Sequence, residues 1–186
     1  MYLINGAQRK TIDSATVKNE TFVLKGNLSE ATHTYLHQGK TNKLADILLD
    51  NREILVSGSR PLYDSIKVSG SDIDIQLDEC LEEDRRISNR RYRLNQISKS
   101  LTDKGDTATT NKIKVLADEL MNDRILLLKK SVKKYGDSPV GAVLVNFCTI
   151  PDRLTKEDFL EMYNSLSVAM KNTYYGEEIK KRASKK

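Results

Sequence analysis

The chain has 186 residues, of which 38% are hydrophobic and 31% charged, a balance typical of a folded globular protein rather than a disordered one. Its formal net charge of +5 is mild and does not by itself favour a nucleic-acid or membrane-surface role. The sequence has no run of about eighteen apolar residues and no export signal at its start, so we expect neither a membrane span nor a leader in this chain.

The first 70 residues carry the alternating apolar pattern of short β-strands. In DSATVKNETFVLKG, residues 13–26, apolar side chains alternate on both sides of a polar turn at 18–20. This predicts a β-hairpin with one buried face. LLDNREILVSG, residues 48–58, predicts a second hairpin in the same way. Further strands are expected at 2–5, 34–37 and 65–69, and the short links between strands favour antiparallel pairing.

The period changes after Gly70 from two residues to seven. Apolar residues then recur along one stripe, at Ile73, Cys80, Ile87, Leu94 and Leu101. This predicts a helix over 72–101, roughly 45 Å long. A polar link follows, and a second apolar stripe predicts a helix over 110–134 that folds back as an antiparallel hairpin.

Shorter helices are expected in the last fifty residues. DSPVGAVLVNFC, residues 137–148, reads as an apolar helix with Asp137 or Ser138 as its cap and Pro139 in its first turn. Thr155 and Asp158 have the spacing of a capping box that opens another helix. A last helix is expected near Glu177.

Strands followed by helices, without alternation, indicate an α+β fold. The expected N-terminal part is a small antiparallel β-sheet or sandwich over residues 1–70, the β module. The expected helical region covers 71–186, with the long helical hairpin at about 72–135 followed by short helices.

No catalytic constellation is visible in the sequence. His33 and His37 share a strand face about 13 Å apart, too far to share a metal ion, and we expect them at the surface or the sheet edge. Cys80 and Cys148 lie on or beside apolar helical stripes and are expected to be buried, inert thiols. We therefore expect no catalytic residue, no metal, no cofactor and no enzymatic activity in this chain.

The charged segments are expected to be solvated helix faces. This applies to the acidic pairs and clusters, Asp72 with Asp74 and Glu82 with Glu83 and Asp84. It also applies to RRISNRRYR, residues 85–93, which supports an alternative hypothesis. Its exposed arginines could bind nucleic acid or another anionic partner, through phosphate contacts by Arg85, Arg86, Arg90 and Arg93.

Four segments resemble a domain of unknown function that stands at the N-terminus of bacterial envelope proteins of the thiol–disulfide interchange and AhpC/TSA, peroxiredoxin-like type. They are the two hairpin segments, IKVSGS at 66–71, and KKYGDSPVGAVLV at 133–145. The resemblance spans roughly residues 2–182. It differs at the turns, where Glu20 and Arg52 replace the usual glycines.

The resemblance implies a non-catalytic accessory or scaffold domain, because in such proteins the redox motif lies in a thioredoxin-like domain that this chain lacks. The implied partner is that thioredoxin-like domain or protein. The implied location is the periplasm or the outer-membrane side of the cell envelope, with any membrane attachment through a lipid anchor outside this chain. A homodimer through the long helices is a further hypothesis.

Overall fold

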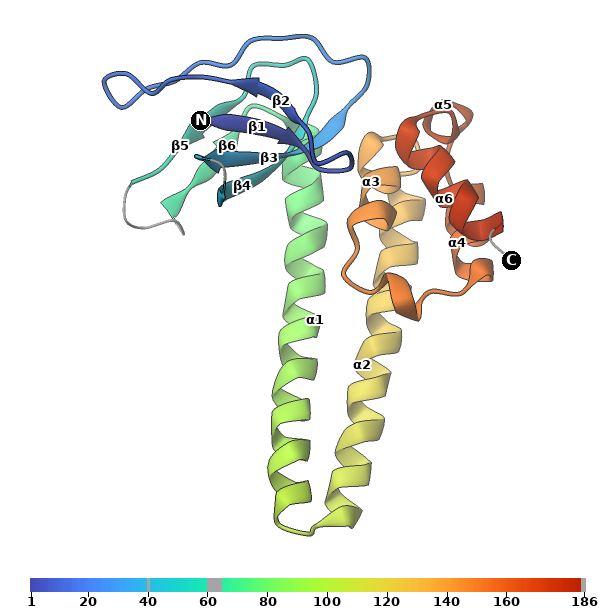
Figure 1. The fold of residues 1–186 in the computed structure, drawn as a ribbon. Coiled ribbons are helices and arrows are strands. Elements are labelled where there is room, and N and C mark those ends of the chain that lie inside the picture. The colour runs from blue at the N-terminus through green and yellow to red at the C-terminus, as the bar shows by residue number, and fades with distance from the viewer. Residues whose placement is uncertain (40, 60–64, 185–186) are drawn as a thin grey trace. The chain divides into compact units, whose positions relative to one another are not determined.

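The structure, a computed structural model, describes residues 1–39, 41–59 and 65–184. It divides into two compact units, Met1–Leu77 and Asp78–Lys186. The fold is α+β, as the sequence predicts: an antiparallel sheet precedes a series of helices (Figure 1).

Four strands of the first unit form one antiparallel sheet in the order β2-β1-β3-β4. The strands are β1 (Tyr2–Asn5), β2 (Thr11–Ser14), β3 (Thr32–Gln38) and β4 (Asn42–Leu49). The expected strands at 2–5 and 34–37 are confirmed, and the second is longer than predicted. Because β3 lies between β1 and β4, its residues are covered along both edges.

The predicted pairing across residues 48–58 is wrong. β4 pairs with β3, whereas β5 (Leu55–Ser57) pairs with β6 (Lys67–Ser69) in a separate two-stranded sheet. The Asn51 side chain accepts a hydrogen bond from the Leu28 N–H at 2.8 Å and donates one to the Leu28 carbonyl at 2.9 Å. Asn51 therefore ties its segment to a distant stretch of chain instead of closing a tight turn.

The first predicted hairpin is confirmed only at its turn. Lys18 and Thr21 form a bridge, with Asn19 and Glu20 at φ 48° and 62°, as a two-residue hairpin turn requires. Beyond the bridge no regular ladder follows among these described residues, and Val17 is 45% exposed rather than buried. The first residues of the predicted hairpin belong to β2 instead, and β2 pairs with β1.

The first turns of α1 (Asp72–Asp103) complete the core of the first unit. A carboxylate oxygen of Asp74 accepts the Leu48 N–H at 2.6 Å, and Asp74 and Leu77 are each 3% exposed, so the expectation of a solvated Asp74 is wrong. The expected module boundary at residue 70 thus lies before residues that pack with the strands, and the first unit ends at Leu77.

The second unit contains the rest of α1 and α2 (Thr107–Lys134). A tight turn joins the two helices, with Gly105 at φ 79°, and they run antiparallel as predicted (Figure 1). Two contacts fix their register: Asp84 meets Arg124, and the Arg91 guanidinium donates to the Ala117 carbonyl at 3.1 Å. None of the described helices is long and apolar enough to cross a lipid bilayer.

Short helices cover the end of α2 that follows Arg124. α3 (Pro139–Phe147) is buried from Val140 to Val145, and Ser138 caps it with Pro139 in the first turn, as predicted. The remaining helices are η2 (Pro151–Arg153), α4 (Lys156–Asn164), α5 (Val168–Lys171) and α6 (Tyr174–Ser184). The Thr155–Asp158 capping box is present. The last helix begins three residues before Glu177.

Candidate functional site

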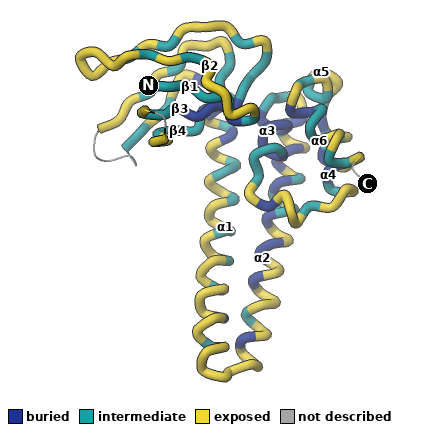
Figure 2. Tube along the Cα trace, viewed as in Figure 1, coloured by how far each residue is buried: buried dark blue, intermediate teal, exposed yellow. Residues whose placement is uncertain are grey.

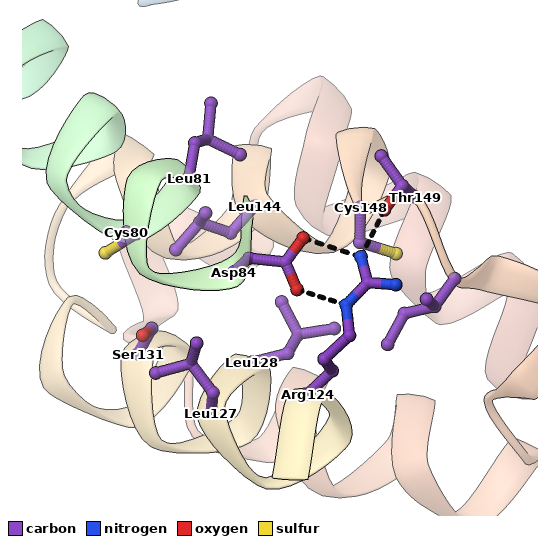
Figure 3. A pocket seen from close by; sticks show the side chains of 11 residues that line it. Cys80, Leu81, Asp84, Arg124, Leu127, Leu128, Ser131, Leu144, Cys148 and Thr149 are labelled. Atoms are coloured by element: carbon purple, nitrogen blue, oxygen red, sulfur yellow. Dashed lines mark hydrogen bonds and ion pairs between the residues drawn. The ribbon is translucent and has the colours of Figure 1, made fainter. Parts of the chain in front are cut away.

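A pocket in the second unit brings both cysteines to one place in the fold. It has room for about 30 Å³, roughly one or two water molecules. Figure 3 shows Cys80 and Cys148 at opposite ends, with the Asp84 and Arg124 side chains between them. The two thiols therefore line one pocket but do not converge on a point.

The centre of the pocket is an ion pair with two parallel hydrogen bonds. Arg124 Nε and Nη2 each donate to a carboxylate oxygen of Asp84 at 2.6 Å, and Nη2 also donates to the Thr149 hydroxyl. Arg124 is 5% exposed. The pair joins α1, α2 and the segment after α3, so its role within the unit is a structural link.

Partial burial favours the protonated form of both thiols, although Cys80 and Cys148 are half-buried rather than fully buried as expected. Burial raises the pKa of the Cys80 thiol, and the hydrogen bond with Ser131 and the charge of Lys134 do not cancel that effect. Burial likewise raises the pKa of Cys148, whose Sγ donates to the Val145 carbonyl at 3.3 Å. Because the thiolate is the reactive form, these surroundings reduce the reactivity of both cysteines.

The basic segment of α1 is exposed, as the sequence predicts for a solvated face. Arg86 pairs with Glu82 at 2.7 Å, one helical turn earlier. All four candidate arginines are exposed: Arg85, Arg86, Arg90 and Arg93. Arg91, which is not among the four predicted phosphate-binding arginines, points instead to α2, where it donates to the Ala117 carbonyl.

The expectation of surface histidines is wrong. His33 is 3% exposed and His37 is half-buried, because both lie on β3, an inner strand of the sheet. Gly6 on the neighbouring segment makes room for the His33 ring, since a Cβ at that position would overlap it. The Tyr35 ring lies 5.1 Å from the His33 ring and 6.3 Å from the His37 ring, so the two imidazoles share no ligand position.

Charged side chains surround Tyr35 on the same sheet face. The Arg9 guanidinium and Lys43 Nζ lie over its ring, at 4.7 Å and 5.1 Å from the centroid. Asp46 contacts Lys43 Nζ at 2.7 Å and His33 Nε2 at 3.5 Å. Partial burial favours a higher pKa for Asp46, but hydrogen bonds with His33 and Lys43 outweigh it and hold that pKa below its ordinary value.

The central ion pair was not predicted from the sequence. Asp84 was expected with Glu82 and Glu83 on a solvated face, but it turns inward to Arg124, a residue that no motif marks. A signal was present: Asp84 lies seven residues after Leu77, and Arg124 lies four after Leu120, so both occupy apolar stripes. Charged residues on facing stripes of a helical hairpin are candidates for a buried pair.

The second unit has a further hollow, whereas the described residues form no cluster of metal ligands. Within the described ranges, no three histidine, cysteine, aspartate or glutamate side chains gather as ligands for a metal ion. A second, shallower hollow of about 150 Å³ opens between α1 and α2, and Glu79, Glu83, Lys130 and Lys134 are among its lining residues.

One family model matches most of the first unit. Residues 1–74 match a domain of unknown function, DUF4369. The matched segment contains all six strands of the described residues and ends at Asp74, the α1 residue that accepts the Leu48 N–H, so the family model and the packing agree closely on where this part ends. No curated protein matches the chain, and no solved structure does.

Proposed function

We propose that this chain is a non-catalytic accessory module that positions or docks a thioredoxin-like redox domain at the cell envelope. The match of residues 1–74 to DUF4369 supports the β part of the resemblance from which this proposal starts. The turn at Asn19 and Glu20 supports it further, since this short segment of the resemblance adopts the expected turn.

The observation that carries the non-catalytic part is the state of the two thiols. Each has its pKa raised by burial, and the Asp84–Arg124 pair lies between them. A thiol–disulfide exchanger needs an accessible thiolate. The arrangement around Cys80 and Cys148 favours the opposite, two protonated thiols held in a packed helical unit.

A thiol–disulfide exchange assay on the purified chain tests this part. We expect turnover of a disulfide substrate at the uncatalysed rate, and the same rate for the Cys80→Ser and Cys148→Ser variants. Turnover that either substitution abolishes would make the chain an oxidoreductase and end the proposal.

A binding titration tests the docking part, with a thioredoxin-like domain of a bacterial envelope protein as the probe. We expect binding that survives the double substitution of both cysteines by serine, because docking needs no thiol chemistry. No binding of the wild-type chain, or capture only through a mixed disulfide, would contradict the docking role.

A second candidate function is binding of an anionic partner through the exposed arginines of α1. The exposure of Arg85, Arg86, Arg90 and Arg93 favours it. A salt titration with a generic oligonucleotide decides the matter: several phosphate contacts give a steep loss of affinity with salt, and an arginine-to-alanine set should reduce that slope. Absence of binding at low salt removes this candidate.

A further inference from the structure

We propose that two copies of this chain associate through one face of the α1–α2 hairpin, forming a four-helix bundle in which α1 of each copy packs on α2 of the other. This inference goes beyond the proposed function and does not depend on it. It rests on which side chains share that face and on the order of their charges along it.

The face is defined by one stripe on each helix, and we call it the open face. The α1 stripe follows helical spacing of three and four residues, and so does the α2 stripe. The shallow hollow shows that the two stripes lie on the same side of the hairpin, because Glu79 and Glu83 line it together with Leu127, Lys130 and Lys134. On α1 the open face consists of Glu79, Glu83, Arg86, Arg90, Leu94, Ile97 and Leu101; on α2 it consists of Ile113, Leu116, Asp123, Leu127, Lys130 and Lys134, while Leu120, at the same spacing, is buried.

Apolar side chains remain accessible on the part of this face near the turn. Ile97 and Leu116 are each 49% exposed, and Leu94, Leu101 and Ile113 are only half-buried. In Figure 2 the turn end of the hairpin is largely exposed, with most of its buried positions on α2. Two helices alone leave such an apolar stripe partly exposed to solvent, and a second pair of helices would cover it.

The open face has three successive zones along the hairpin, and each zone includes residues of α1 and α2 that stand at the same height. The register of Asp84 with Arg124 and of Arg91 with Ala117 sets which residues stand side by side. Glu79 and Glu83 stand level with the stretch around Lys130, and Arg86 stands level with Asp123. Nearer the turn, Leu94 and Ile97 stand level with Ile113 and Leu116.

The order of these zones favours a second copy of the chain as the partner, and it also sets the direction in which the second hairpin points. A two-fold axis along the hairpin places α1 of one copy over α2 of the other at equal height. Glutamates of one copy then face lysines of its partner, Arg86 faces Asp123, and the apolar zones meet. If the hairpins pointed in opposite directions, the apolar zone of one copy would lie against the charged zone of the other.

The size of the face fits a specific dimer. From Glu79 to Leu101 it is about 33 Å long at about 1.5 Å per residue, and two helices at roughly 10 Å each make it about 20 Å wide. That gives roughly 650 Å² on each copy, or about 1,300 Å² in total, at the lower end of the range for stable protein–protein interfaces.

Sedimentation of the full chain across a concentration series tests the proposal. We expect a reversible dimer of twice the 21.1 kDa chain mass. Leu116→Glu should raise the dissociation constant at least about tenfold, because it introduces a charge into the apolar zone. Val115→Glu is the matched control: Val115 is the adjacent residue, 58% exposed but off the open face, so this change should leave dimerisation within about twofold. A monomer at every concentration, or equal effects of the two substitutions, would overturn the proposal.

A charge-exchange experiment tests the orientation without relying on a fold-sensitive variant. Arg86→Glu and Asp123→Lys should each weaken self-association, because in a dimer of either variant the substituted residue faces a like charge on the other copy. An equimolar mixture of the two should recover association, since a mixed dimer has one reversed and one native attractive contact. A mixture that associates no better than either variant alone would exclude α1 packing on α2 of the second copy.

Discussion

Among single residues, Arg124 is a buried cation of the second unit with three side-chain hydrogen bonds. It is nearly inaccessible and donates to both oxygens of Asp84 and to Thr149. The planar guanidinium suits this role because it presents two parallel donors to one carboxylate, which a lysine ammonium cannot do. A buried charge held this way is costly to leave unpaired but cheap to replace together with its partner.

We therefore predict a non-additive pair of substitutions. Asp84→Leu should lower the free energy of unfolding by about 2–3 kcal/mol, because it leaves the Arg124 charge buried without its carboxylate. Adding Arg124→Met should restore stability to within about 1 kcal/mol of wild type, since both charges are then removed. Urea denaturation measures both values. A double variant less stable than Asp84→Leu alone would show that the pair contributes net stability of its own.

Among the secondary-structure elements, the two helices of the hairpin carry acidic and basic segments in a complementary order beside their apolar stripes. α1 is acidic at 79–84 and basic at 85–93; across the antiparallel register, α2 is basic at 129–134 and acidic at 118–123. Opposite charges thus stand at equal heights in the two helices. This order favours the observed register over a slipped one, because a shift of two turns would bring like charges together.

The start of α4 links local capping to tertiary packing. Asp158 accepts the Thr155 backbone N–H at 2.7 Å and also contacts Lys129 Nζ of α2 at 2.6 Å. Partial burial favours a higher pKa for Asp158, but the hydrogen bonds from Lys129 and Thr155 outweigh it and hold that pKa below its ordinary value. A carboxylate with a lowered pKa stabilises the folded state above its ordinary pKa, and this stabilisation is lost as the pH falls through the folded-state value.

Asp158→Asn should therefore lower stability at pH 7 by about 1 kcal/mol, and the difference from wild type should shrink as the pH falls below about 4, where the carboxyl of the unfolded chain becomes protonated while the folded one still resists protonation. Thermal unfolding at pH 7 and pH 3 measures the difference. Ser138→Ala is the control, because its hydroxyl caps α3 by accepting the Val140 N–H, a contact that involves no carboxylate, so its loss should cost the same at both pH values. A difference for Asp158→Asn that is unchanged at pH 3 would contradict the assignment.

At the scale of the whole molecule, the chain consists of two units that each have a core. The first contains the buried strands and the start of α1, and its buried residues include Leu36, Leu48 and Leu77. The second is built on α2 and α3, with Val132 and Val143 fully buried. A change confined to one core should thus be felt mainly within its own unit.

Asp74→Ala tests this independence by hydrogen exchange. Removal of the carboxylate leaves the buried Leu48 N–H without its acceptor, which costs about 1–3 kcal/mol, so amides of β3 and β4 should exchange faster while those of α2 and α3 keep their rates. Asp72→Ala is the matched control, because Asp72 is on the same helical turn but only makes a surface pair with Arg52. Equal acceleration in both units would show that they unfold as one.

Local signals account for the parts of this fold that the sequence predicted well. The limits of the long helices follow from the seven-residue period of Ile73, Cys80 and Ile87 and from the glycine turn at Gly105, all readable within a few residues. The cap at Ser138 and the capping box at Thr155 are equally local, since each is made by a side chain and a backbone N–H within three residues.

The mispredicted parts depend on contacts far apart in the chain. Alternation marks a segment as a strand but carries no information on its partner, so β4 was assigned to β5 when it pairs with β3. His33 is polar and was expected at the surface, yet its burial follows from the inner position of β3 and from the space that Gly6 leaves. Asp84 was assigned to solvent because its buried partner is 40 residues away.

The α+β order, the long antiparallel helices and the helix caps can be read from the sequence, because periodicity and capping act over a few residues. The strand pairing, the raised pKa of both thiols beside an Asp84–Arg124 pair, and the matched zones of charge and apolar surface on one face of the helical hairpin come from the folded arrangement. Those features depend on burial and on juxtaposition across the fold, which no local pattern encodes.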